Sequence, residues 1–159
     1  MISRKIEDWL QTIGLFGVVG SLIFVGLQLK QDREIALSEI WQQRTATVVE
    51  KVSSLASNEM ALSAFEKAAN GRLDEITPIE DQAGLFEVWG AMFLWENSHY
   101  QYTLGFLPDE HWKRVRVDIK SQLQKPFWGP KMLELTTVVR PSFGAVVEEI
   151  NRELIAEED

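Results

Sequence analysis

The sequence predicts an all-α protein, with one N-terminal transmembrane helix that continues into a stalk helix and then a small irregular helical bundle. Residues 9–29 are apolar over a membrane-spanning length, and residues 30–55 keep helical spacing with neither Pro nor Gly. No later stretch alternates polar and apolar residues as a strand would. We therefore divide the chain into an N-terminal flank (1–8), a transmembrane helix (9–29), a stalk helix (30–56), a helical domain (57–156) and an acidic tail (157–159).

The composition narrows the class of protein. The chain has 159 residues, a formal net charge of −8, no Cys and two His. An acidic surface repels phosphate backbones, so we expect no nucleic-acid partner. Without Cys there is no disulfide, thiolate metal site or Cys nucleophile, and two His are too few for a His-rich metal centre. We expect neither a cofactor nor a bound metal.

The apolar segment has the features of a membrane-spanning helix. From Ile13 to Leu27 no side chain is charged, and Ser21 is the only polar one. About 20 such residues cross a hydrocarbon core of about 30 Å, and Trp9 and Lys30 suit the two interfaces. A cleaved signal peptide would have a shorter core and a small-x-small site, and a buried soluble helix would rarely run this far without a charge. We expect a single-pass anchor in the cell inner membrane.

Basic residues lie on both sides of this segment and are nearly balanced. Arg4 and Lys5 precede it, whereas Lys30, Arg33 and Arg44 follow it. Because cytoplasmic flanks carry the excess of Lys and Arg, we expect the C-terminal domain to be cytoplasmic.

Small residues share one face of the membrane helix. Gly14, Gly17 and Ser21 lie at i, i+3 and i+7, and Gln28 continues the same stripe. Small residues let helix backbones approach closely in lipid, although Gly is also common in membrane helices generally. This face predicts a homo-oligomer, so the expected partners are the lipid bilayer, further copies of the chain and a protein bound by the domain.

The stalk carries its own apolar stripe at helical spacing, with Arg44 inside it. This stripe packs either on the chain's own domain or on a neighbouring stalk. It consists of Leu37, Ile40, Trp41, Val48, Val52 and Leu55.

Pro, Gly and capping residues divide the domain into helices. A short helix capped by Ser57 or Asn58, with Leu62 and Phe65 inward, ends at Asn70–Gly71. Thr77-Pro78-Ile79-Glu80 is a capping box that opens a helix to about Leu104. Three more helices are expected over 108–124, 131–139 and 141–154, with a break at 125–130 and a frayed tail at 157–159.

Aromatic and polar residues gather between Phe86 and Trp112. The expected inward stripe of the helix after Pro78 is Leu85, Trp89, Phe93, Glu96 and Tyr100. Because an acid on an apolar face is unfavourable unless it is paired, we expect Arg44 to pair with Glu96, with Arg140 as the alternate.

The same region carries the pattern EN-x-x-YQY-x-x-G, followed by a Trp. With the anchor that ends in LQL, this pattern resembles an uncharacterised family of short bacterial single-pass membrane proteins. The resemblance covers most of the chain and implies a shared fold but no particular activity. The residues that carry it are Glu96, Asn97, Tyr100, Gln101, Tyr102, Gly105 and Trp112.

Four interpretations of this cluster are open. Glu96 and His99 form a Glu-x-x-His motif, but a di-metal bundle needs two of them. The same pair could act as general acid and base, although no nucleophile or phosphate loop accompanies it. Aromatic walls around Glu96 could enclose a small ligand or peptide. In the fourth interpretation, a buried polar network fixes how the stalk meets the bundle; its members would be Arg44, Glu96, Asn97, His99, Tyr100 and Gln101.

The sequence contains no convincing catalytic constellation, so we predict a non-enzymatic protein. The leading prediction is a membrane-anchored scaffold or interaction protein that self-associates through its membrane helix. The alternatives are an anchored sensor with an aromatic pocket around Glu96 and an oligomeric pore, for which Ser21 and Gln28 offer little polar lining. A basic strip either contacts anionic lipid or is a solvated face beside its own acids; it comprises Lys113, Arg114, Arg116 and Lys120.

Overall fold

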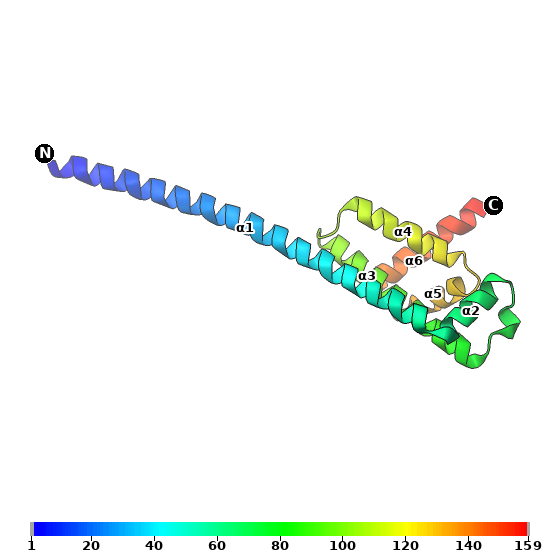
Figure 1. The fold of residues 1–159 in the computed structure, drawn as a ribbon. Coiled ribbons are helices and arrows are strands. Elements are labelled where there is room, and N and C mark those ends of the chain that lie inside the picture. Colours follow the sequence, from blue (N-terminus) through cyan, green and yellow to red (C-terminus); the bar gives the residue numbers. More distant parts are fainter. Residues whose placement is uncertain (1, 159) are drawn as a thin grey trace. The chain divides into compact units, whose positions relative to one another are not determined.

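The computed structural model describes the backbone of residues 2–158 and the side chains of residues 9–157. Within that part of the chain every regular element is a helix, which confirms the predicted all-α fold (Figure 1). Arg4 and Lys5, whose charges bear on orientation, and Asp159 lie outside the described side chains. The elements are α1 (Ile2–Ser57), α2 (Glu59–Ala69), the short 3-10 helix η1 (Leu73–Glu75), α3 (Pro78–Thr103), α4 (Asp109–Leu123), α5 (Trp128–Leu135) and α6 (Pro141–Glu158).

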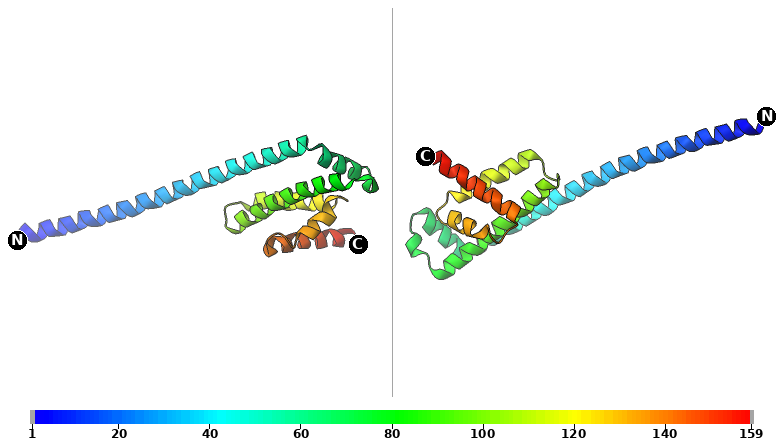
Figure 2. Two further views of the ribbon diagram at one scale, coloured as in Figure 1. Left: turned by 90° about the horizontal axis from the view of Figure 1, so that it is seen from below. Right: turned by 180° about the vertical axis from the view of Figure 1, so that it is seen from behind.

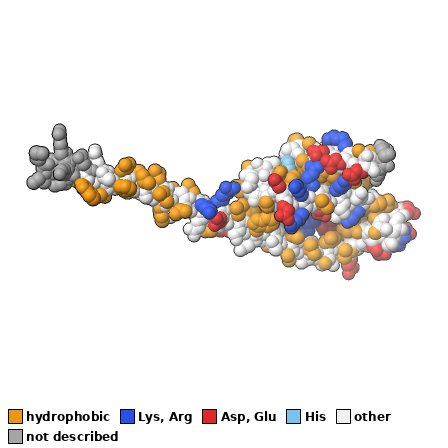
Figure 3. All heavy atoms as spheres, turned by 90° about the horizontal axis from the view of Figure 1, so that it is seen from above, with side chains coloured by type: hydrophobic (Ala, Val, Ile, Leu, Met, Phe, Trp, Pro, Cys, Tyr) orange, Lys and Arg blue, Asp and Glu red, His pale blue; other side chains and the backbone are white. Residues whose placement is uncertain are grey.

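Helix α1 passes from the apolar segment into the stalk without a break, as predicted. Among the described residues it is the one helix long and apolar enough to cross a membrane. Every side chain from Trp9 to Leu29 is exposed, and Figure 3 shows apolar side chains along this part of α1. A core helix of a soluble protein would instead bury such a surface.

The chain divides into two compact units, the first ending at Thr47 and the second beginning at Val48. The last turns of α1 therefore belong to the same unit as α2–α6. Inside that second unit α2, α4 and α5 pack against α3, and α6 packs on α4 and α5 (Figure 2).

The helix boundaries follow local backbone chemistry. The Asn58 side chain caps α2, and Thr77 and Glu80 close the predicted capping box of α3. Gly71 and Gly105 both adopt φ +73°, a left-handed conformation that ends a helix most easily at Gly.

Helix α5 lies earlier in the chain than predicted. This helix begins at Trp128 rather than Lys131 and ends at Leu135 rather than Val139. Pro130 does not prevent the earlier start, because a first-turn residue needs no intrahelical N–H bond. Gly129 also lets the backbone pass against the Leu123 carbonyl, where a Cβ would clash.

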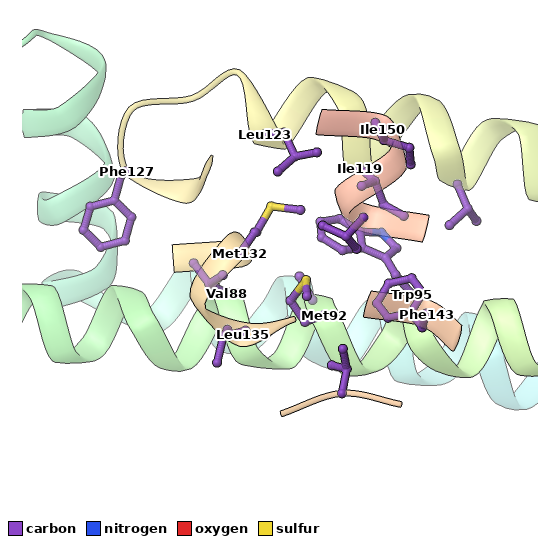
Figure 4. Packing of buried hydrophobic residues seen from close by; sticks show 14 of the residues in the cluster. Val88, Met92, Trp95, Ile119, Leu123, Phe127, Met132, Leu135, Phe143 and Ile150 are labelled. Carbon is purple, nitrogen blue, oxygen red and sulfur yellow. The ribbon is translucent and has the colours of Figure 1, made fainter. Parts of the chain in front are cut away.

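The core shows that the predicted inward stripe of α3 was wrong. Its large aromatic residues are substantially exposed, with Trp89 at 37%, Phe93 at 44% and Tyr100 at 43%. Figure 4 shows that α3 instead turns Val88, Met92 and Trp95 toward the other helices. The buried stripe is thus shifted by about one residue, or about 100° around the helix.

Two further expectations differ from the structure at the ends of the domain. Leu62 is exposed, because α2 buries the small residues Ala61, Ala64 and Ala68 instead. Helix α6 continues to Glu158, and its Glu157 carboxylate accepts a hydrogen bond from Lys120 Nζ at 2.6 Å. The segment predicted as a frayed tail is therefore helical up to Glu158.

Candidate functional site

The Glu96 carboxylate, at the centre of the predicted site, is bound by Arg140. Glu96 Oε1 accepts a hydrogen bond from the backbone N–H of Arg140 at 2.8 Å and lies 3.6 Å from Arg140 Nε. The Glu96 side chain is 15% exposed, so most of its surface is shielded from water. Arg44 belongs to the first unit, and its pairing with Glu96 stays a prediction.

Glu96 meets Arg140 where α6 begins. Arg140 directly precedes Pro141, the first residue of α6. An N-terminal backbone N–H of a helix lacks an intrahelical partner and is partly positive. The α3 carboxylate satisfies that donor, as the Glu of a capping box would do from within the helix. Glu96 therefore joins α3 to the start of α6.

The Arg140 guanidinium also covers an exposed aromatic ring. Its Cζ lies 4.1 Å from the centroid of the Tyr100 ring, which is a cation–π contact. Glu96, Arg140 and Tyr100 thus form one small cluster at the surface of the second unit.

His99 lies in an aromatic environment of its own. Its ring centroid is 5.2 Å from that of Trp112 and 5.8 Å from that of Phe143. Burial lowers the pKa of His99, and the nearby charge of Glu96 opposes that shift. Glu96 and His99 therefore contact different elements: Glu96 contacts the start of α6, and His99 contacts rings of α4 and α6.

The remaining motif residues pack the end of α3 against α4. The Tyr102 and Trp112 rings stack with centroids 5.4 Å apart, and a hydrogen bond to the Asp109 carboxylate raises the pKa of Tyr102. On the buried face, Trp95 Nε1 donates to Asp118 Oδ2 at 3.0 Å. These contacts give the YQY segment and its following Trp a structural role.

Asn97 and Gln101 lie at the edge of this cluster. Gln101 Nε2 is 3.5 Å from Asn97 Oδ1, and Asn97 is exposed. The structure thus brings Glu96 and Tyr100 together through Arg140, holds His99 among aromatic rings and leaves Asn97 toward solvent.

The cavities near these elements are small. A crevice beside Trp89 and Phe93 is too narrow to admit even a water molecule, and an open groove between α4 and α6 holds about 230 Å³. Ligand pockets usually measure about 300–1,000 Å³. Neither hollow matches the aromatic pocket around Glu96 that the sensor interpretation requires.

The basic strip on α4 is engaged with acids. Arg116 pairs with Glu149 and Glu153 of α6 at 2.9 and 3.0 Å, and Arg114 pairs with Glu110 on its own helix. Lys120 is bound by Glu157. These pairs favour the interpretation of a solvated face over that of a lipid-binding one.

The sequence interpretation missed a buried carboxylate between α2 and α3. Glu80 closes its own capping box and also accepts hydrogen bonds from Lys67 Nζ at 2.7 Å and from Ser63 Oγ at 2.5 Å. The Lys67 ammonium, the Ser63 hydroxyl and Thr77 hold the pKa of Glu80 well below its usual range. The sequence identified Glu80 as a capping-box residue, but a capping box depends only on neighbouring residues and does not predict the contacts of Glu80 with α2.

A second missed contact joins the end of α1 to α3. Lys51 Nζ donates to Glu87 O at 3.0 Å and to Glu87 Oε2 at 3.1 Å. Glu87 is buried, and Gly90 leaves room for the lysine, because a Cβ there would lie 2.5 Å from Lys51 Nζ. Glu87 was missed because the predicted inward stripe of α3 was offset by about one residue and did not include it.

Comparison of the chain with protein-family models, with curated proteins and with solved structures finds no match. The fold and the site together describe an all-α domain that follows a helix of membrane-spanning length. The resemblance carried by the EN-x-x-YQY-x-x-G pattern stays a prediction.

Proposed function

We propose that this protein is a membrane-anchored helical scaffold that self-associates through α1 and uses its C-terminal domain as an interaction module. The observation that carries the proposal is the continuity of α1, which joins an apolar segment of spanning length to the second unit. Because the apolar segment and the domain belong to one chain, assembly in the bilayer would raise the local concentration of the domains.

The small-residue face of α1 supports self-association. A Cβ added at Gly14 or Gly17 would meet no other atom within 4 Å, so this face is open to a second helix. The Ser21 hydroxyl donates to Gly17 O at 2.8 Å. Its hydrogen is satisfied within the helix, so the face can lie against lipid or another helix without an unpaired donor.

The link between Lys51 and Glu87 supports a mechanical role for α1. Lys51 holds the last turns of the helix to α3 through a backbone and a carboxylate oxygen. The end of α1 is thus part of the domain, so the helix that carries the apolar segment is also a structural element of the second unit.

Exposed aromatic residues on α3 support an interaction role for the domain. Phe86, Trp89, Phe93 and Tyr100 lie along one side of the helix, and their exposed fractions range from 37% to 64%. Contiguous exposed apolar side chains are typical of protein interaction sites. We propose a protein partner for this face, with the domain in the cytoplasm and the anchor in the inner membrane.

The mass of the detergent-solubilised protein tests the proposal. We expect an oligomer for the unmodified chain and less of it for Gly17→Leu, because a large side chain separates the helix backbones. Gly26→Leu is the matched control, since Gly26 lies on the opposite side of α1 and is equally open. A monomeric unmodified chain would overturn the proposal, and equal oligomer in both variants would remove the Gly17 face from it.

A further inference from the structure

We propose that a second copy of this chain binds the exposed side of α3, so that two domains meet in a symmetric dimer centred near Phe93. The inference rests on the proposed self-association and names the protein partner of the domain. We call the exposed side of α3 the α3 face; it consists of Ile79, Gln82, Phe86, Trp89, Phe93, Asn97, Tyr100 and the C-cap residue Leu104.

The α3 face is apolar, although the side of a helix that faces water is usually polar. Its residues follow one another at steps of three or four and lie within about 80° around the helix. All of them are exposed, and the amides of Gln82 and Asn97 are its most polar groups. The exposed fractions of the other members run from 37% at Trp89 to 64% at Phe86. Helix α3 is therefore apolar on two sides, and the core of the domain covers only one of them.

The apolar surface continues beyond α3 at Val138. This residue is 51% exposed, and it lines a narrow crevice together with Trp89 and Phe93. Val138 lies just before α6, so two segments of the domain contribute to the surface. The α3 face and Val138 thus form one contiguous apolar patch, and such patches are typical of protein interaction sites.

The exposed area of this patch is that of a small interface. An aromatic side chain has about 150–250 Å² of surface, so the exposed parts of the four rings amount to roughly 400 Å² per copy. Ile79, Leu104 and Val138 raise this to roughly 600 Å² per copy, which is near the lower limit of specific protein interfaces. Copies held in one bilayer meet at a much higher effective concentration than a free partner does. A second copy is therefore the partner for which so small an interface is sufficient.

The charges of α3 also favour a second copy. Every acid of this helix lies off the α3 face and is paired with a cation from another element; the pairs are Glu80–Lys67, Asp81–Lys131, Glu87–Lys51 and Glu96–Arg140. A partner selected by its positive charge would find no unpaired acid on this helix. An identical uncharged face, by contrast, meets no like-charge repulsion.

The rings of the α3 face are held in place within one copy. Trp89 and Phe93 make an edge-to-face contact with centroids 5.8 Å apart, and the Arg140 guanidinium lies 4.1 Å from the centroid of the Tyr100 ring. Association costs less conformational entropy when the contacting side chains are already ordered. Trp, Tyr and Arg are also the residue types that contribute most to protein binding. The face is thus ordered for contact before a partner arrives.

Phe93 lies at the centre of the α3 face, midway in the sequence between Phe86 and Tyr100. Most homodimers have two-fold symmetry, in which the same patch of each copy forms the interface. A residue near the axis then contacts its own counterpart. The proposed dimer therefore brings the two Phe93 side chains together.

Phe93→Asp and Phe93→Lys test this dimer in the full-length protein in detergent micelles, by sedimentation at a series of protein-to-detergent ratios. Each variant places two like charges near the axis, so we expect the dissociation constant of the dimer to rise by about tenfold or more. An equal mixture of the two variants should regain dimers, because Asp then faces Lys, whereas variants that had merely unfolded would not recover. Val117→Asp is the matched control, since Val117 is 68% exposed and lies on α4.

Single cysteines give a second measurement without a change of charge. Because the chain has no Cys, Asn97→Cys on the α3 face and Ser121→Cys on α4, both at exposed positions, report proximity between copies. We expect a short bis-maleimide to cross-link Asn97→Cys into dimers and Ser121→Cys far less. Equal cross-linking would overturn the inference. So would quenching of a fluorophore on Asn97→Cys by nitroxide lipids in nanodiscs, because the bilayer would then cover the α3 face.

The outcomes separate this inference from the proposed function. If the unmodified chain dimerises, but Phe93→Asp resembles Val117→Asp and the mixture regains nothing, the α3 contact is refuted and association through α1 stands. If the unmodified chain and every variant are monomeric, the proposed self-association fails and the α3 contact fails with it.

Discussion

The carboxylate of Glu96 on α3 accepts a hydrogen bond from the backbone N–H of Arg140 at 2.8 Å. Arg140 directly precedes α6, so this bond gives a partner to an N–H group that the helix itself leaves without one. The Arg140 guanidinium adds a longer contact, 3.6 Å from the same oxygen, and its side chain is 55% exposed. The backbone bond is therefore the stronger part of this relationship.

This geometry predicts unequal effects of removing the two side chains. Glu96→Ala should lower the free energy of unfolding by about 1–2 kcal/mol, as loss of a helix cap does. Arg140→Met should lower it by less than about 1 kcal/mol, because a solvent-exposed ion pair contributes little. Chemical denaturation in detergent micelles, followed by tryptophan fluorescence, measures both. An equal loss of unfolding free energy in the two variants would mean that the contact depends on the Arg140 guanidinium rather than on the Arg140 backbone N–H.

The contact between Lys51 and Glu87 predicts a larger effect. Lys51→Met leaves the buried Glu87 carboxylate without its cation and should cost about 2–3 kcal/mol, somewhat less than a fully buried pair because Lys51 retains some exposure. The double variant Lys51→Met/Glu87→Gln should recover part of the loss, since no buried charge remains. Lys125→Met at an exposed position is the control. Equal stability of Lys51→Met and this control would contradict a structural role for the link.

The Glu80 network predicts loss of stability in acid. Its pKa is lowered in the folded protein, first by Lys67 and then by Ser63 and Thr77. Its contribution is therefore present above the unfolded value near 4.5 and disappears as the pH falls toward the folded value. As the pH falls below about 4.5, the free energy of unfolding should therefore decrease less steeply for Glu80→Gln than for the unmodified chain. The same decrease in both proteins would show that Glu80 is not the source of the loss of stability in acid.

His99 predicts a separate change nearer neutrality. Burial lowers its pKa from 6.5, so below that pH the unfolded chain takes up a proton that the folded chain resists. Stability should consequently decline as the pH drops below about 6.5, and His99→Phe should reduce that decline because phenylalanine does not titrate. Thermal unfolding at a series of pH values measures it, with His111→Phe as the matched control. An unchanged slope in His99→Phe would exclude His99 as the source.

Helix caps and stops depend on residues close in the chain, and the sequence predicted most of them. The capping box at Thr77, a cap at Ser57 or Asn58, the stop at Gly71 and the end of α3 near Leu104 were all predicted, because each depends on backbone groups within a few residues. The start of α5 was missed because Pro130 is compatible with a break and with a first helical turn alike.

The candidate site was predicted only in part for the same reason. The spacing of α3 marked Glu96 as an acid that needs a partner, and the sequence favoured Arg44 with Arg140 as the alternate. The placement of Arg140 at the start of α6 made it the partner within the second unit. The side of α3 that is buried was likewise beyond the sequence, because the exposed Trp89 and Phe93 are more apolar than much of the face that the neighbouring helices cover.

The sequence by itself determined the continuous α1, the apolar segment of spanning length and the local starts and stops of the domain helices. These features depend on composition and on hydrogen bonds between residues close in the chain. Only the tertiary structure decided which side of α3 is buried, that Glu80 binds Lys67 and that Glu87 binds Lys51. Those outcomes depend on which surfaces meet when α2–α6 pack, and on charges that must find a partner once water is excluded.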